Sequence, residues 1–319
     1  MTVTLRPRTK GRITELADLL GDWDTHLISK GRSKETRYSY LRCARALLTH
    51  LEKHLESTKV GDIDHRKLEG FQAALVLAGR APATVAKHYR SLQQLFGWLY
   101  DEEEIATNPM DRMKPPAVPE QLVELLDIDQ VRALIATASA KPGKALNGSD
   151  GPEFVARRLL AQLWCFIDTG ARLDEIATLR LDEVHFDIGV LDVMGKGRRR
   201  RNAPFGPKTA NALRRYLRVR AGHKCADLPA LWLGERGPMT GSGIYQAINK
   251  LAVRAGIPVH PHLFRHYFAD AWLDAGGGER ALMEVAGWRS PAMVARYAKA
   301  NAAKRARKAH HRMDLTRDL

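Results

Sequence analysis

The sequence predicts a mainly α-helical protein with one small β-hairpin in its second half, an α+β fold divided into two domains. Three observations support this expectation. Apolar residues recur at helical spacing along most of the chain, one short segment has the pattern of a hairpin around glycines, and a proline-rich stretch separates the two halves. A length of 319 residues leaves room for two hydrophobic cores.

Four helices are expected between residues 13 and 108. The apolar stripes of the first two consist of Leu16, Leu19, Leu20, Trp23 and Leu27, and of Leu41, Ala44, Leu48, Leu51 and Leu55. Asp64 is suited to cap a third helix, which Gly79 ends. The fourth begins after Pro82 and repeats apolar side chains at spacings of four and three.

Residues 108–119 contain four prolines and are expected to form the linker between a first domain, residues 1–115, and a second, residues 120–319. The second domain should be mostly helical. Its hairpin is expected to have strands at 189–194 and 200–205. A glycine-rich segment at 275–279 should interrupt the later helices, and residues 302–312 are basic and helix-prone.

The charge balance indicates a polyanionic partner. The chain has 51 Lys and Arg against 36 Asp and Glu, a net charge of +15, which favours attraction to nucleic acid. Two basic clusters stand out: Arg198, Arg199, Arg200 and Arg201, and Lys304, Arg305, Arg307 and Lys308. Each alone could be a solvated surface; together they favour nucleic acid.

Three widely spaced cysteines, Cys43, Cys165 and Cys225, fit a reducing compartment better than a disulfide framework. No apolar run is long enough to span a membrane, and the first residues lack the core of a signal peptide. We therefore expect a soluble, cytoplasmic protein.

Three residues near the end of the chain suggest phosphate chemistry. His262 and Arg265 are spaced to share one helix face, where they could bind an oxyanion and move a proton. Tyr297 could then attack phosphorus as a nucleophile. The alternative is a zinc pair of His262 and His266, or ordinary helix residues. Zinc is disfavoured because no Glu lies between the two histidines and no further ligand has suitable spacing, so no metal is expected.

Two more basic residues have distinctive settings. Lys196 lies between two glycines at the predicted hairpin tip, where it could reach a groove or simply grip backbone phosphate; the spacing does not fit a P-loop. Arg172 follows a glycine at the start of an amphipathic turn, so its side chain should face a groove. Glu175 could orient Arg172, or the two could form an ordinary surface salt bridge.

With these residues in this order, the sequence resembles the tyrosine recombinase family, which includes phage integrases and Xer-like proteins. The matching segments are Gly170-Ala-Arg-Leu-Asp-Glu-Ile, Gly195-Lys-Gly, His262-Leu-Phe-Arg-His, Ala286-Gly-Trp-Arg-Ser and Tyr297, which together cover most of residues 125–300. The first domain resembles the helical, SAM-like core-binding domain of the family. Trp288 replaces the histidine that many members carry; some members also use tryptophan there.

The resemblance implies a two-domain DNA clamp and a site-specific recombinase that needs neither metal nor nucleotide cofactor. Tyr297 would form a 3'-phosphotyrosine link, Arg172, Arg265 and Trp288 would stabilise the phosphate, Lys196 would protonate the leaving oxygen, and His262 would accept the tyrosine proton. Strand exchange would pass through a Holliday junction. Lys87 and Arg90 of the fourth helix, together with Arg198 to Arg201, are expected to bind DNA.

The resemblance also implies assembly as a homotetramer on duplex recombination sites, with the C-terminal helix docking on a neighbouring subunit; accessory factors could take part. The short stretch before the first helix favours a simple Xer-like or Cre-like system or a small mobile-element integrase. Two rival functions stay open: a catalytically silent DNA-binding regulator of recombinase descent, and a type IB topoisomerase.

Overall fold

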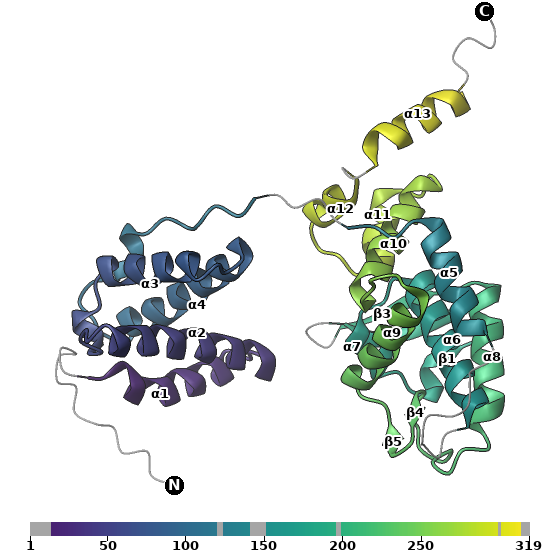
Figure 1. Cartoon of the computed structure of the whole chain (residues 1–319), viewed down its shortest axis with the longest axis horizontal. Coiled ribbons are helices and arrows are strands. Elements are labelled where there is room, and N and C mark those ends of the chain that lie inside the picture. Colours follow the sequence, from purple (N-terminus) through teal and green to yellow (C-terminus); the bar gives the residue numbers. More distant parts are fainter. Residues whose placement is uncertain (1–13, 120–123, 141–150, 196–198, 299–300, 314–319) are drawn as a thin grey trace, which may run out of the picture. The chain divides into compact units, whose positions relative to one another are not determined.

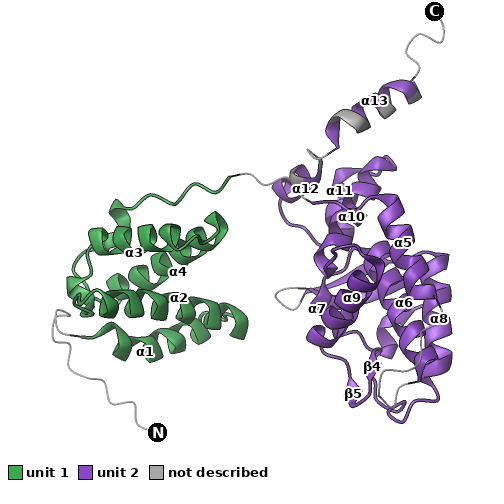
Figure 2. Ribbon diagram, in the orientation of Figure 1, with its two compact units in different colours: residues 1–121 green, residues 122–319 purple. Residues whose placement is uncertain are grey.

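The structure is a computed structural model that describes residues 14–119, 124–140, 151–195, 199–298 and 301–313. The chain divides into two compact units, residues 1–121 and 122–319 (Figure 2). The fold is mainly helical with small antiparallel sheets in the second unit (Figure 1). This confirms the predicted fold class.

The N-terminal unit contains the four expected helices. They are α1 (Leu16–Ser29), α2 (Lys34–Lys53), α3 (His65–Leu77) and α4 (Pro82–Asp101), with 3-10 turns η1 (Val60–Asp62) and η2 (Pro109–Arg112). The Asp64 side chain caps α3 by accepting from the Lys67 N–H at 3.0 Å. The prediction for Leu55 was wrong: α2 ends at Lys53, and Leu55 lies beyond it in a left-handed conformation, 95% exposed.

The C-terminal unit contains nine of the described helices. They are α5 (Ile128–Ser139), α6 (Pro152–Thr169), α7 (Leu173–Ala177), α8 (Pro207–Arg220), α9 (Gly241–Ala255), α10 (Pro261–Asp274), α11 (Glu279–Ala286), α12 (Pro291–Ala298) and α13 (Ala302–Met313), with a 3-10 turn, η3 (Leu181–Glu183). Helix α6 is central and packs against α5, α8 and α10. The glycine-rich segment interrupts the helices between α10 and α11, as predicted.

The predicted hairpin is present as β2 (Val190–Gly195) and β3 (Arg199–Pro204), which pair antiparallel with Val193 opposite Arg201. A short strand, β1 (Val184–His185), extends this sheet, and β4 (Leu233–Gly234) pairs with β5 (Gly237–Pro238). These three strands were not predicted, because two residues are too few to show a period.

A separate apolar cluster joins α10, α11 and α12. Its buried members are Phe268, Ala269, Leu282, Ala286, Trp288, Val294 and Tyr297. The main core of the unit lies around α6 and the hairpin. Trp288 and Tyr297 belong to the smaller cluster instead.

Cys43, Cys165 and Cys225 are free thiols, and Cys43 and Cys165 are buried. Within the described ranges, no helix has the length and apolar character needed to cross a bilayer.

Candidate active site

Arg172 is positioned by the end of α6. The helix ends at Gly170, which has a φ of +56° and lies so close to Phe268 that a Cβ would overlap its ring. The chain then turns through buried Ala171 to Arg172, the N-cap of α7. The Arg172 side chain is 35% exposed and donates to Glu175 Oε1 at 2.8 Å. Its guanidinium therefore lies at the surface, partly open to a ligand.

Glu175 is 2% exposed and lies between two arginines. Its Oε2 accepts from the Arg172 backbone N–H at 2.8 Å and from Arg201 at 2.7 Å. Burial raises the pKa of this carboxyl, but Arg201, Arg172 and the backbone N–H outweigh burial and leave the pKa below its ordinary value. Glu175 is thus an ionised, buried carboxylate, and its pair with Arg172 is not an ordinary surface salt bridge.

Arg265 lies inside the protein at 2% exposure. It donates to the carbonyls of Gly170 at 2.7 Å and Ala286 at 2.5 Å, and its guanidinium carbon lies 5.0 Å from the centre of the Trp288 ring. Burial and nearby Arg172 lower its pKa to about 10, so Arg265 stays charged at neutral pH. Arg265 is therefore buried, whereas His262, one turn earlier on α10, is exposed.

His262 and His266 follow one face of α10 towards Tyr297. Their ring centres are 4.8 Å apart, and the His266 ring lies 5.2 Å from that of Tyr297. Partial desolvation of His262, with the nearby charges of His266 and Arg265, lowers its pKa to about 4. His262 is thus neutral at physiological pH and able to accept a proton.

Trp288 and Tyr297 form a parallel stack, with ring centres 5.0 Å apart and planes inclined by 4°. Tyr297 is 2% exposed and Trp288 6%. Across the described part of the chain, no acceptor reaches the buried indole Nε1 of Trp288. This indole N–H is therefore a buried donor with no acceptor among the described residues.

Lys196 and Arg198 lie outside the described residues. Gly195, at the end of β2, lies against Glu175: a Cβ there would be 3.5 Å from Glu175 Oε1. The strand that leads to Lys196 therefore ends next to the carboxylate that binds Arg172.

The remaining predicted DNA-binding residues differ in exposure. Arg199 and Arg200 are exposed, and Arg200 pairs with Asp192 at 2.9 Å. Arg201 points inward at 11% exposure and donates to Glu175 and to the carbonyl of Val285. On α4, in the other unit, Arg90 is exposed and Lys87 is half-buried.

Sequence reasoning missed the roles of two residues around the site. One is Arg201, which looked like a member of a basic cluster. The other is Asp270, which binds Asn301 and Arg305 at the start of α13. The i,i+4 spacing of His262, His266 and Asp270 was a usable signal, since it places them along one face of α10.

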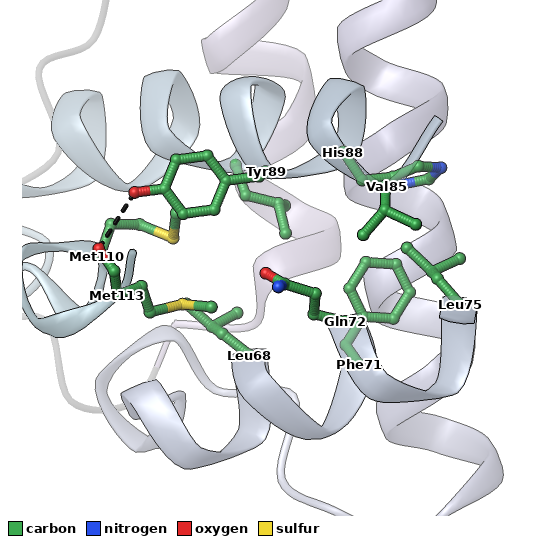
Figure 3. Close-up of a pocket in the computed structure, with 10 residues that line it drawn as sticks. Leu68, Phe71, Gln72, Leu75, Val85, His88, Tyr89, Met110 and Met113 are labelled. Carbon is green, nitrogen blue, oxygen red and sulfur yellow. Dashed lines mark hydrogen bonds between the residues drawn. The ribbon is translucent and has the colours of Figure 1, made fainter. Parts of the chain in front are cut away.

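No three His, Cys, Asp or Glu side chains within the described ranges are grouped as a metal site requires. A small pocket lies elsewhere, inside the N-terminal unit between α3, α4 and η2 (Figure 3). Its lining is apolar apart from Gln72, His88 and Tyr89, and the Tyr89 hydroxyl donates to the Met113 carbonyl at 3.1 Å. It contains none of the predicted catalytic residues.

Arg265 binds the Gly170 carbonyl two residues before Arg172 and lies against Trp288, which stacks on Tyr297. These contacts bring the segments that carry Arg172, Arg265, Trp288 and Tyr297 together. Two cations, an indole N–H with no acceptor among the described residues, and a phenol beside His266 have the chemistry needed to bind a phosphate and attack it.

Comparison with known proteins gives family matches for both parts of the chain. Residues 124–304 match the phage integrase family, and residues 20–103 match the phage integrase N-terminal SAM-like domain. The tyrosine recombinase XerC of Mycobacterium leprae is 32% identical over 88% of this chain and 93% of its own. XerD of Listeria innocua is 27% identical over 85% of this chain and 90% of its own.

Solved structures share the fold at low identity. The Tn1549 transposon integrase in complex with transposon right end DNA has a TM-score of 0.72 and 17% identity, and the match covers 93% of this chain and 100% of that one. The XerH site-specific recombinase bound to its difH substrate has a TM-score of 0.71 and 15% identity, over 92% and 84% of the two chains. The motifs, the two family matches and these relatives agree, and the chain belongs to the phage integrase family of tyrosine recombinases.

Proposed function

We propose that this protein is a site-specific recombinase that cuts and rejoins duplex DNA through a 3'-phosphotyrosine intermediate. The observation that carries the proposal is the packing of Tyr297 against Trp288, which in turn lies against the guanidinium of Arg265. Arg172 supplies a second, partly exposed cation. XerH and the Tn1549 integrase, which share the fold, were solved with a palindromic difH substrate and with transposon right end DNA.

In the first step, the Tyr297 hydroxyl oxygen attacks the scissile phosphorus. A bond forms between phosphorus and the tyrosine oxygen, the bond to the 5' oxygen breaks, and a free 5'-hydroxyl leaves. The tyrosine proton passes to neutral His262, and Lys196 donates a proton to the leaving oxygen. Arg172, Arg265 and the Trp288 N–H stabilise the charge that develops on the non-bridging oxygens.

In the second step, a 5'-hydroxyl from another strand attacks the phosphotyrosine and restores a phosphodiester. Exchange of the first pair of strands produces a Holliday junction, and exchange of the second pair resolves it. Each step breaks one phosphodiester bond and forms another, so the reaction needs no nucleotide as an energy source. Cationic side chains take the role that metal ions have in other phosphoryl transfers.

Recombination joins two DNA sites, so several copies of the protein must act together. We propose that the two units clamp the DNA, that four chains meet on two duplexes, and that α13 docks on a neighbouring subunit. The net charge of +15 and the 67% exposure of Met313, at the end of α13, support this arrangement.

The decisive experiment traps the covalent intermediate. A suicide substrate, nicked a few nucleotides 3' of the scissile phosphate so that the short fragment carrying the new 5'-hydroxyl diffuses away, should give an SDS-resistant protein–DNA adduct in EDTA and without nucleotide. Tyr297→Phe should reduce this adduct by roughly 10³-fold or more, because the ring and its packing remain but the nucleophilic oxygen is lost.

Retention of the adduct by Tyr297→Phe would reject the nucleophile, and a strict requirement for Mg²⁺ would reject the metal-free mechanism. An inactive wild type that binds DNA would favour the silent regulator. Relaxation of supercoiled plasmids without exchange between paired sites would favour the topoisomerase.

A further inference from the structure

Arg201 differs from the other described arginines of its basic cluster. Arg200 is 62% exposed, whereas the Arg201 side chain is 11% exposed. On strand β3 it lies opposite Val193, a fully buried residue. An arginine in this setting is poorly placed to meet a DNA phosphate, because its Nη1 and Nη2 already donate inside the protein and its Nε is buried.

Arg201 joins two separate parts of the site. One arm of its guanidinium binds Glu175 Oε2 at 2.7 Å, and Glu175 in turn binds Arg172. The other arm donates to the carbonyl of Val285, in the last turn of α11. A single planar side chain thus links the segment that carries Arg172 to the segment that leads into Trp288.

The turn after α11 is shaped around this side chain. Gly287 has a φ of +64°, and a Cβ built on it would lie 2.8 Å from Arg201 Cδ. Gly287 therefore meets both conditions that call for glycine, a left-handed backbone and a close neighbour. Trp288 follows directly, and its backbone N–H donates to the Met283 carbonyl at 2.9 Å.

We propose that Arg201 is a positioning residue for DNA cleavage: it holds Arg172 and Trp288 in register on the two sides of the phosphate, rather than contacting DNA itself. The proposal rests on the proposed recombinase function for its catalytic meaning. Without Arg201, the Glu175 carboxylate would lose one of its two cations, and the Val285–Trp288 turn would lose its link to β3. Small displacements of phosphate-binding groups reduce rates strongly.

The first test needs no DNA. Hydrogen exchange of the free protein should show faster exchange of the Gly287 and Trp288 amides in Arg201→Lys and Arg201→Met. Lysine keeps a charge opposite Glu175 but lacks the second arm that reaches Val285, so this variant should fold even if Arg201→Met does not. Unchanged exchange at residues 283–288 in both variants would overturn the inference.

A matched control separates this role from general stabilisation. Arg220 is 3% exposed and donates to the backbone carbonyls of Ala226, Leu228, Ala230 and Leu231, away from the predicted catalytic residues. Arg220→Met should lower the melting temperature. It should leave exchange at 283–288 and the cleavage rate constant of the folded fraction unchanged. Equal effects of Arg220→Met and Arg201→Met at 283–288 would also overturn the inference.

The second test uses the suicide substrate at saturating DNA. Arg201→Met should lower the cleavage rate constant by about 10- to 10²-fold, with the dissociation constant for DNA within about twofold of wild type and partial recovery in Arg201→Lys. A residue that contacts phosphate would give the opposite pattern, which would reject the proposal. Its loss would weaken DNA binding, reduce the slope of log affinity against log salt by about one, and leave the cleavage rate constant at saturating DNA unchanged. If wild type forms no adduct, the recombinase proposal fails while the exchange result still decides the structural link.

Discussion

A neutral histidine beside two arginines is the most informative single side chain of this site. His262 is surrounded by His260, His266, Arg265 and Arg172, all of which oppose a further positive charge, and partial burial acts in the same direction. At neutral pH the imidazole therefore has a free nitrogen lone pair, as a proton acceptor requires.

We predict that His262 remains neutral down to about pH 5 in the DNA-free protein, because its pKa is lowered from 6.5 to about 4. The measurement is an NMR titration of the imidazole signals, assigned with His262→Asn. The unfolded chain takes up this proton first as pH falls, so the stability that His262 contributes is complete above about 6.5 and declines towards 4. A midpoint close to 6.5 would contradict the prediction.

Sequence reasoning predicted which residue types make up the site but not how deeply each lies. The i,i+3 rule placed His262 and Arg265 on one face, yet Arg265 turns inward because two backbone carbonyls, of Gly170 and Ala286, are available to it there. Those acceptors come from segments distant in sequence, and no local pattern reports them. The same holds for Glu175, whose second cation comes from another element.

Among the helices, α10 organises the end of the chain. Asp270 accepts from Asn301 at 2.9 and 3.0 Å and from Arg305 at 2.7 Å, and Arg305 also donates to the Tyr297 carbonyl at 3.1 Å. The start of α13 is thus fastened within its own chain to the helix that carries His262. Docking of α13 on a neighbour, as proposed above, would concern its later turns.

We predict that Asp270→Asn loosens the start of α13 without unfolding the unit. Loss of a charge-assisted contact is worth about 1–2 kcal/mol, which corresponds to roughly 5- to 30-fold faster exchange of the amides near Arg305. Hydrogen exchange of the free protein measures this. Asp129→Asn, which breaks an exposed pair with Arg132, is the control and should change little. Equal protection in wild type and Asp270→Asn would show that the contact does not secure α13.

The helices of the first unit and the hairpin were predictable because their periods extend over many residues. Leu55 shows where this fails: it continues the spacing of α2, but the helix ends at Lys53. The three two-residue strands depend on pairing with partners elsewhere in the chain, so sequence patterns cannot predict them.

Across the full chain, the excess of positive charge should determine how binding depends on salt. With a net charge of +15, affinity for duplex DNA should fall steeply as salt rises. Arg90→Met and Arg199→Met each remove an exposed cation expected to contact phosphate, and each should reduce the slope of log affinity against log salt by roughly one.

Fluorescence anisotropy with a labelled duplex at several salt concentrations measures these slopes. Arg157→Met is the control, because Arg157 lies on α6 roughly 20 Å along the helix from Gly170 and pairs with Glu153. A slope change as large in Arg157→Met as in Arg199→Met would show that the salt dependence of DNA binding follows the net charge of the protein and not these two contacts.

The stack of Trp288 on Tyr297 also has a consequence for the synthesis of the protein. During translation, Arg172 and the hairpin are synthesised long before the segment from Trp288 to Tyr297. The small cluster that buries the tyrosine needs all of α10, α11 and α12. A chain interrupted before this segment would retain many of its basic residues but have no nucleophile. On the proposed function, unfinished copies could occupy DNA but could not break it.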